Sequence, residues 1–124
     1  MIVVRGGLPA SKDQKYGDFE DEPGVRNKLY RHPGSDFRSA VVASVELAPG
    51  KARTAALFKK PSQALEDTIN HGRVAAITAQ GFTEMQGGPP IVVDNDVVGA
   101  IGASFDTPEH DVQIARAGLA AVSH

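Results

Sequence analysis

The sequence contains no cysteine and no tryptophan, and only two tyrosines and five phenylalanines occur among its 124 residues. Without cysteine the protein has no disulfides, no thiolate metal sites, no iron–sulfur clusters and no cysteine nucleophile. The scarcity of aromatic side chains argues against a platform for stacking nucleobases. Leucine, isoleucine, valine and phenylalanine make up about 24% of the chain. We therefore expect a modest core filled mainly by valine and alanine.

The sequence has no large excess of charge of either sign. It contains 13 lysines and arginines and 15 aspartates and glutamates, which gives a formal net charge of -2. The chain thus has no positive excess with which to gain affinity for nucleic acid by releasing counterions. It has neither an apolar run long enough to span a membrane nor the apolar region of a signal peptide near its start. We expect a cytoplasmic protein that binds neither nucleic acid nor membranes.

The length predicts a single domain over residues 1–124. Residues 1–37 form a charged, turn-rich segment in which Pro23-Gly24 and Pro33-Gly34 indicate turns. We expect short extended pieces here, with an edge strand at residues 2–4. The remaining chain is more regular and carries most of the apolar residues.

Two helices are expected in the middle of the chain. Pro49 suits the first turn of a helix that continues through Phe58. Pro61 would stop that helix, and Ser62 would cap a second one over residues 63–70. His71-Gly72 would close its C-terminus.

Strands and a last helix follow. Residues 74–78 and the segment around Phe82 indicate short strands, and residues 91–93 and 97–101 indicate a hairpin. Thr107 can cap a final helix that has Pro108 at its first position. One face of this helix is apolar, with Val112, Ala115, Leu119 and Val122. This order predicts an α+β domain with helices packed on an antiparallel sheet.

Several residues have the chemistry of a binding site. The glycine-bearing turns Gly87-Gly88-Pro89-Pro90 and Gly99–Ser104 permit close approach of backbone, although they also suit simple packing. The start of the final helix, next to Ser104 and Asp106, could hold an anion. Lys51 and Thr54 share one side of their helix, so they face either a pocket or solvent.

The four histidines are scattered at positions 32, 71, 110 and 124, without the spacing of a zinc site. Haem iron needs only one axial protein ligand and an apolar slot, so a single histidine would suffice. The pattern favours His71 as a helix cap and His110 as an exposed residue. No serine, histidine and aspartate have the context of a catalytic triad. The metal-ligating residue, if there is one, is unknown from the sequence.

Three motifs occur in a fixed order: Lys51-Ala-Arg-Thr-Ala55, Gly87-Gly88-x-Pro90 and Gly99-Ala-Ile-Gly102-x-Ser104. Together with Phe58, Pro61-Ser62 and the segment through Asp111, they make residues 38–122 resemble the GlcG/HbpS family. That family includes the C-terminal domain of PduO-type proteins.

The resemblance implies a profilin-like α+β fold, assembly into homo-oligomers and, in several members, binding of haem or a related tetrapyrrole. It implies binding residues among the motif positions: Lys51, Thr54, Phe58, Gly87, Gly88, Pro90 and Ser104. Phe105, which follows Ser104, is added to these candidates from its own apolar side chain. Asp111 is interpreted as a residue of the helix start rather than a catalytic one.

The sequence departs from the family pattern in two places. Family members usually open with a long amphipathic helix and a strand pair, whereas residues 1–37 are short, charged and turn-rich. A glycine commonly follows the serine of the last family strand, but Phe105-Asp106 follow Ser104 here. Phe105 could wall an apolar pocket, and Asp106 could act as an acid, a base or a helix cap.

The leading interpretation is a protein that binds a small ligand, with haem or another tetrapyrrole as the first candidate. A second interpretation is a small-molecule enzyme or accessory factor of a catabolic pathway in which Asp106 transfers a proton. It requires Asp106 to lie in a cleft beside Lys51 or Ser104. A third is a structural subunit that pairs with itself or with an enzyme.

Overall fold

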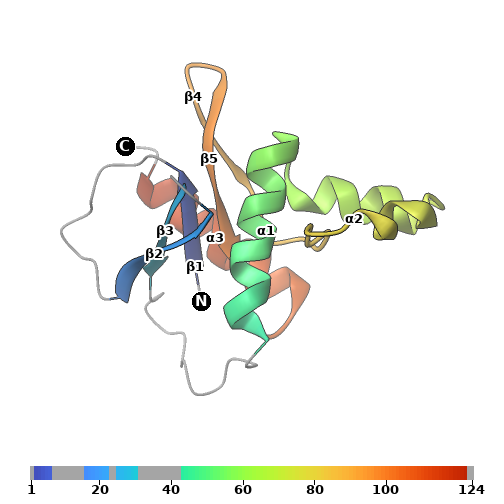
Figure 1. Ribbon diagram of the computed structural model, residues 1–124, viewed down its shortest axis with the longest axis horizontal. Coiled ribbons are helices and arrows are strands. Elements are labelled where there is room, and N and C mark those ends of the chain that lie inside the picture. Colours follow the sequence, from blue (N-terminus) through green and yellow to red (C-terminus); the bar gives the residue numbers. More distant parts are fainter. Residues whose placement is uncertain (1, 7–15, 23–24, 31–42, 123–124) are drawn as a thin grey trace.

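A computed structural model describes residues 2–6, 16–22, 25–30 and 43–122 (Figure 1). Its elements, in chain order, are β1 (Ile2–Gly6), β2 (Tyr16–Glu22), β3 (Val25–Tyr30), α1 (Ser44–Phe58), α2 (Ser62–Asn70), the 3₁₀ helix η1 (Val74–Thr78), β4 (Pro90–Val93), β5 (Asp96–Ala103) and α3 (Pro108–Val122). The expected turns at Pro23-Gly24 and Pro33-Gly34 lie outside the described residues, as do His32 and His124.

The described strands form one sheet in the order β2-β3-β1-β5-β4, and every neighbouring pair is antiparallel. This confirms the predicted α+β fold with helices on an antiparallel sheet. The expectation of an edge strand at residues 2–4 is wrong, because β1 lies in the middle of the sheet. Ile2 pairs with Tyr30 on one side and with Ala103 on the other. A pairing partner a hundred positions away leaves no local signal in the sequence.

Helix α1 packs on one face of β5 through small residues. Ala100 contacts the buried alanines Ala52 and Ala55. A Cβ atom on Gly102 would lie only 1.9 Å from the carbonyl oxygen of Ala48. Gly102 is therefore required for the helix backbone to lie this close to the strand.

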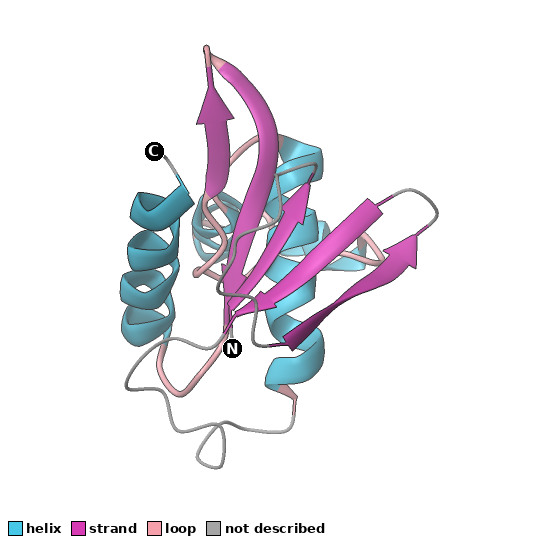
Figure 2. Cartoon of the chain, turned by 90° about the vertical axis from the view of Figure 1, so that its left-hand side faces the viewer, coloured by secondary structure: helices cyan, strands magenta, loops and turns pink. Residues whose placement is uncertain are grey.

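Helix α3 covers the opposite face of the sheet (Figure 2). Ile101 and Ala103 of β5 form a core with Ile91 of β4 and Ala115 of α3. Successive side chains of a strand point to opposite faces. Along β5, Ala100 and Gly102 therefore face α1, whereas Ile101 and Ala103 face α3.

Helix α1 begins at Ser44, earlier than predicted, and Pro49 lies inside it. Proline has no N–H group to donate within a helix, which is why its position predicted a helix start. The additional turn is stabilised by packing, since Ala48 is fully buried beneath the sheet contact at Gly102. Tertiary contact outweighs the local preference of proline here.

Helix α2 ends as predicted and begins differently. His71 is its C-cap, with its N–H on the carbonyl of Asp67, and Gly72 follows with φ of 111°. Ser62 is the first helical residue rather than a side-chain cap. Its N–H donates to the Gly88 carbonyl. Within the described residues, Ser62 Oγ is buried with no hydrogen-bond partner.

Residues 74–78, predicted as a strand, form the 3₁₀ helix η1. The N–H of Ala76 donates to Arg73 and that of Ala79 donates to Ala76, both three residues back. This segment packs next to α2, away from the sheet, so it has no strand with which to pair. The segment around Phe82 is likewise not a strand.

Residues 62–78, comprising α2 and η1, form an arm that projects from the body of the fold (Figure 1). Its packing is mainly between its own two helices and against α1. No described residue of η1 is buried. The arm thus depends on the body less than α1 and α3 do.

The hairpin and the final helix follow the sequence prediction. Strands β4 and β5 are joined by Asp94 and Asn95, which have φ of 50° and 68°. Thr107 Oγ1 accepts the N–H of His110, so Thr107 caps α3 as expected. In the described part of the chain, no helix has the length and apolar character needed to cross a membrane.

Candidate functional site

A cavity of about 490 Å³ lies where α1, the arm and the start of α3 meet. Its wall is formed by residues from four segments: Leu47, Lys51, Glu66, Ile69, Asn70, Ile77, Glu84, Met85, Gln86, Ser104, Phe105, Asp106, Thr107, Pro108 and Asp111. Most of the exposed wall surface is apolar. Its volume falls within the range of small-molecule sites.

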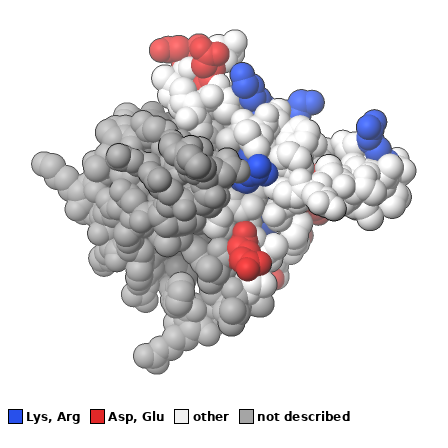
Figure 3. Space-filling model, in the orientation of Figure 1, with Lys and Arg blue, Asp and Glu red and all other residues white. Residues whose placement is uncertain are grey.

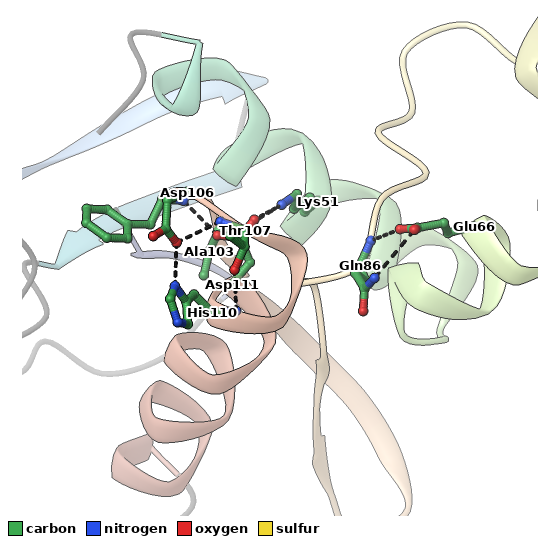
Figure 4. A network of polar contacts seen from close by, with 9 residues as sticks. Lys51, Glu66, Gln86, Ala103, Asp106, Thr107, His110 and Asp111 are labelled. Carbon is green, nitrogen blue, oxygen red and sulfur yellow. Dashed lines mark hydrogen bonds and ion pairs between the residues drawn. The ribbon is translucent and has the colours of Figure 1, made fainter. Parts of the chain in front are cut away.

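A buried ion pair forms part of this wall (Figure 4). Lys51 Nζ lies 2.6 Å from Asp111 Oδ2, and the two residues are 1% and 6% exposed. Lys51 Nζ also donates to the carbonyl of Ala103 at 3.0 Å. Asp111 Oδ1 accepts the N–H of Phe105 at 2.7 Å. Because each charged group has a second hydrogen bond, the pair ties α1, the end of β5 and α3 together.

Gly87 and Gly88 allow the chain to pass close to this ion pair. Gly87 has φ of 109°, and a Cβ there would lie 2.9 Å from Asp111 Cβ and 3.3 Å from Lys51 Nζ. A Cβ on Gly88 would lie 2.6 Å from the Lys51 carbonyl oxygen and from Ser62 Oγ. Gly87 therefore leaves room for side chains of α1 and α3, and Gly88 leaves room for α1 and α2.

Asp106, which lines the cavity, forms an exposed pair with His110. His110 Nδ1 lies 2.7 Å from Asp106 Oδ1, and their side chains are 54% and 43% exposed. Asp106 Oδ1 also accepts the N–H of Thr107 at 2.6 Å. Desolvation raises the pKa of Asp106, but the hydrogen bonds from His110 and Thr107 and the charge of His110 outweigh it and hold the pKa below its ordinary value. Asp106 is therefore a carboxylate at neutral pH.

The cavity brings together four of the residues selected from the sequence. Lys51, Ser104, Phe105 and Asp106 all contribute to its wall. Lys51 is buried and paired, so the interpretation of a residue facing solvent is wrong for it. Asp106 lies in the same cavity wall as Lys51 and Ser104, but its side chain is 43% exposed and accepts the Thr107 N–H just before α3.

The other selected residues lie elsewhere. Thr54 is fully buried, donates to the Gly50 carbonyl and accepts the N–H of Thr83. The ring of Phe58 meets that of Phe82 edge to face, with centroids 4.9 Å apart. Pro90 pairs with Ala100 in the sheet. Gly87 and Gly88 line a second cavity of about 190 Å³, beside Pro61 and Arg116.

Sequence reasoning missed the role of Asp111 as the partner of Lys51. A signal for it exists, because Asp111 occupies the apolar face of its helix with Ala115 and Leu119, four and eight positions on. Lys51 likewise lies among the buried alanines of α1. Burying a charge costs free energy unless the charge is paired, so opposite charges on two apolar helix faces indicate a buried ion pair.

The arm's contribution to the wall was also missed. Ile69 and Ile77 line the cavity from α2 and η1, and Glu66 accepts the N–H of Gln86 there. Glu84 and Met85 complete this side. No motif marks these residues, since their approach to α3 depends on the tertiary fold. Among the described residues, no three histidines, aspartates or glutamates are placed to hold a metal ion.

Known proteins resemble this chain in sequence and in fold. Protein GlcG of Escherichia coli strain K12 is 46% identical over 54 residues, which are 44% of this chain and 40% of GlcG. The chain thus spans well under half the length of this curated relative. The crystal structure of a PduOC complex with haem has 25% identity and a TM-score of 0.65, covering 98% of this chain and 77% of that chain.

HbpS has the same TM-score of 0.65 at 24% identity, covering 99% of this chain and 74% of that chain, which shows a shared fold. A family model described as haem degrading protein HbpS-like matches residues 35–120. That match spans well over half of the 124 residues. The chain belongs to the HbpS-like family.

Proposed function

We propose that this protein binds haem or a closely related tetrapyrrole in the cavity between α1, the arm and the start of α3. The observation that carries the proposal is the apolar wall of this 490 Å³ cavity. Family membership and the likeness to the PduOC complex with haem support it.

The apolar part of the wall fits a macrocycle. It comes from opposite sides of the cavity: Leu47, Ile69, Ile77, Met85, Phe105 and Pro108. A flat, largely apolar ligand held between such sides would remove exposed side chains of the wall from water. Ile77 and Met85, 61% and 42% exposed, would gain the most.

The charges of the wall restrict how haem fits. Glu66, Glu84, Asp106 and Asp111 bring four carboxylates, and the ammonium of Lys51 is already paired with Asp111. The propionates of haem are negatively charged, so they would be repelled by the carboxylates of the wall. Haem would therefore bind with its apolar edge inward and its propionates toward solvent.

When bound, haem supplies an iron whose reactivity depends on its axial ligand and surroundings. The apolar residues of the wall would exclude water from such a ligand, and the 104–107 turn would form part of its surroundings. The Lys51 and Asp111 pair holds this turn through the Phe105 N–H.

The alternative role of Asp106 in proton transfer has less support. A general acid or base works best with a pKa near the working pH. The pKa of Asp106 is shifted the other way, below that of an ordinary aspartate.

The test is a titration of the purified protein with haemin, followed by absorption spectroscopy. Saturable binding of one haemin per chain with a shifted Soret band supports the proposal. Weak, unsaturable binding by the folded wild-type protein overturns it. An Ile77→Ser variant, which removes an exposed apolar side chain from the wall, tests whether binding occurs in this cavity.

We also propose that the chain self-associates. Support comes from β4, which lies at one edge of the described sheet and leaves Val92 and Val93 about half exposed, as Val98 of β5 is at 42%. Acidic side chains gather at the tip of this hairpin (Figure 3), where Asp94 and Asp96 are exposed. Light scattering across a range of concentrations tests this, and a monomer throughout contradicts it.

A further inference from the structure

The tip of the β4–β5 hairpin has apolar side chains on the face of the sheet that α1 covers further along. Ala100 and Gly102 contact α1 on that face. Alternate residues of a strand share a face, so Val98 and Asp96 point to the same side. Val93 pairs with Asp96 across the hairpin and therefore lies beside them. Val93 and Val98 are 48% and 42% exposed, so α1 leaves this part of the face uncovered.

The same tip is acidic. Asp94 lies in the turn and Asp96 begins β5, and both are exposed. Neither carboxylate forms an ion pair with another described residue. The hairpin tip thus combines two unpaired negative charges with exposed valines.

The C-terminal end of α1 has the opposite charge and a similar apolar part. Leu57 and Phe58 are 53% and 39% exposed. Lys59 and Lys60 follow them directly, and both are exposed. In the part of the chain that the structure describes, no carboxylate pairs with either lysine.

The hairpin tip and the end of α1 lie at the same end of the molecule (Figure 1). Figure 3 shows acidic side chains at the tip and basic side chains beside them on one face. Such a surface is complementary to a copy of itself, because a two-fold rotation places the acidic part of each copy against the basic part of the other. Interfaces of this kind, in which both subunits use the same surface, are the commonest in homodimers.

We propose that two copies of this chain meet through this surface about a two-fold axis. Asp94 and Asp96 of each hairpin contact Lys59 and Lys60 of the partner subunit, and the exposed valines and Leu57 are buried between them. The inference rests on the proposed self-association and adds to it the surface and the arrangement. Burial of the apolar side chains supplies affinity, while the charges fix the orientation.

The experiment uses two charge variants. One combines Lys59→Asn with Lys60→Glu, and the other combines Asp94→Asn with Asp96→Lys. Asparagine is chosen for Lys59 and Asp94 because their φ values of 54° and 50° are left-handed, a conformation that asparagine tolerates. Either variant places like charges at both contacts of its own dimer. We expect the dissociation constant of each dimer, measured by sedimentation equilibrium at low ionic strength, to rise at least about tenfold.

Mixing the two variants is the decisive step. In a mixed dimer, the altered end of α1 meets the altered tip and the native tip meets the native end of α1, so both contacts again join opposite charges. We expect mixed dimers, identified by native mass spectrometry, with an affinity close to that of wild type. The chain carrying all four substitutions should likewise dimerise with itself.

Arg73→Glu, a charge reversal at an exposed position of the arm, is the control and should associate like wild type. Circular dichroism checks that each variant is folded. A wild-type protein that is monomeric at every concentration overturns both the self-association and this interface. Wild-type association that both charge variants retain overturns this interface alone and points to another surface, such as the outer edge of β4. Loss of association that mixing does not restore overturns the reciprocal contact of tip and helix end.

Discussion

Lys51 Nζ and Asp111 Oδ2 lie 2.6 Å apart, although sixty positions separate the two residues in the chain. The contact joins α1 to α3 at the end of the strand between them. Since both charges are almost fully buried, each depends on the other for its solvation.

We expect Lys51→Met to destabilise the protein by about 3 to 5 kcal/mol, because it leaves the Asp111 carboxylate buried and unpaired. Urea denaturation followed by circular dichroism measures this loss. Glu109→Gln, an exposed change in the same turn of α3, is the control and should alter the free energy of unfolding by less than about 0.5 kcal/mol.

The double variant Lys51→Met with Asp111→Leu should recover a large part of that stability, because no buried charge remains. The N–H of Phe105 loses its acceptor in this variant, so recovery should be incomplete. A double variant no more stable than Lys51→Met would contradict the view that the unpaired charge dominates the cost.

Gly87 and Gly72 have nearly the same backbone conformation, with φ of 109° and 111°, but different surroundings. A Cβ on Gly72 would meet nothing within 4 Å, whereas one on Gly87 would meet Asp111 and Ala103 at about 3 Å. We expect Gly72→Ala to lower the free energy of unfolding by about 1 kcal/mol through backbone strain alone. Gly87→Ala should lower it by about 1 to 3 kcal/mol more, because the added methyl group overpacks the site.

Thermal and urea denaturation of the two variants separate these contributions. Equal losses of stability would mean that the backbone conformation, and not the closeness of the ion pair, explains Gly87.

The wall of the cavity permits a similar comparison within η1. Ile77 and Val74 are 61% and 59% exposed, but only Ile77 belongs to the cavity wall. We expect Ile77→Ser to weaken haemin binding about five-fold through lost apolar contact, and Val74→Ser to leave it unchanged. Because neither side chain is buried, both variants should keep wild-type stability. Equal effects of the two variants on affinity would place the ligand elsewhere.

The Asp106 and His110 pair predicts a specific dependence on pH. His110→Gln removes the charge beside Asp106 and should raise the pKa of that carboxyl toward its ordinary value. Titration of the carboxyl carbon by nuclear magnetic resonance measures this, with His71→Gln as the control. Because the pKa of Asp106 is lower in the folded than in the unfolded state, its ionisation stabilises the fold above the unfolded pKa. This contribution is lost as the pH falls through the folded value.

A pKa of Asp106 that stays the same in His110→Gln would show that the Thr107 N–H alone holds the carboxylate.

Local sequence signals predicted the elements that depend on local chemistry. The β4–β5 hairpin follows from its turn residues Asp94 and Asn95, and the start of α3 follows from Thr107 and Pro108. The position of β1 in the sheet could not be read in this way, since both of its partners are distant in sequence. Residues 74–78 have the composition of a strand but no partner strand within reach.

The site shows the same division. The motifs identified Lys51, Gly87 and Gly88, because a charged partner and glycines without a Cβ are needed where the chain passes the buried ion pair. Ile69, Ile77 and Met85 were not identified, because an apolar wall accepts many side chains and so leaves no distinct pattern. The hydrogen bond of His110 with Asp106 was not predicted, because a spacing of four residues is common in helices and does not by itself indicate a contact.

The arm has a consequence for how the cavity opens. One side of the cavity belongs to α1 and α3, which share the cooperative core, while the other belongs to the arm, whose 3₁₀ helix buries no residue. Segments with few buried contacts open at a lower free energy than the global unfolding of their domain. Amide hydrogens of α2 and η1 should therefore exchange with deuterium before those of β5. A ligand held between the two sides would slow that exchange. The exchange rate of the arm would therefore report whether the cavity is occupied.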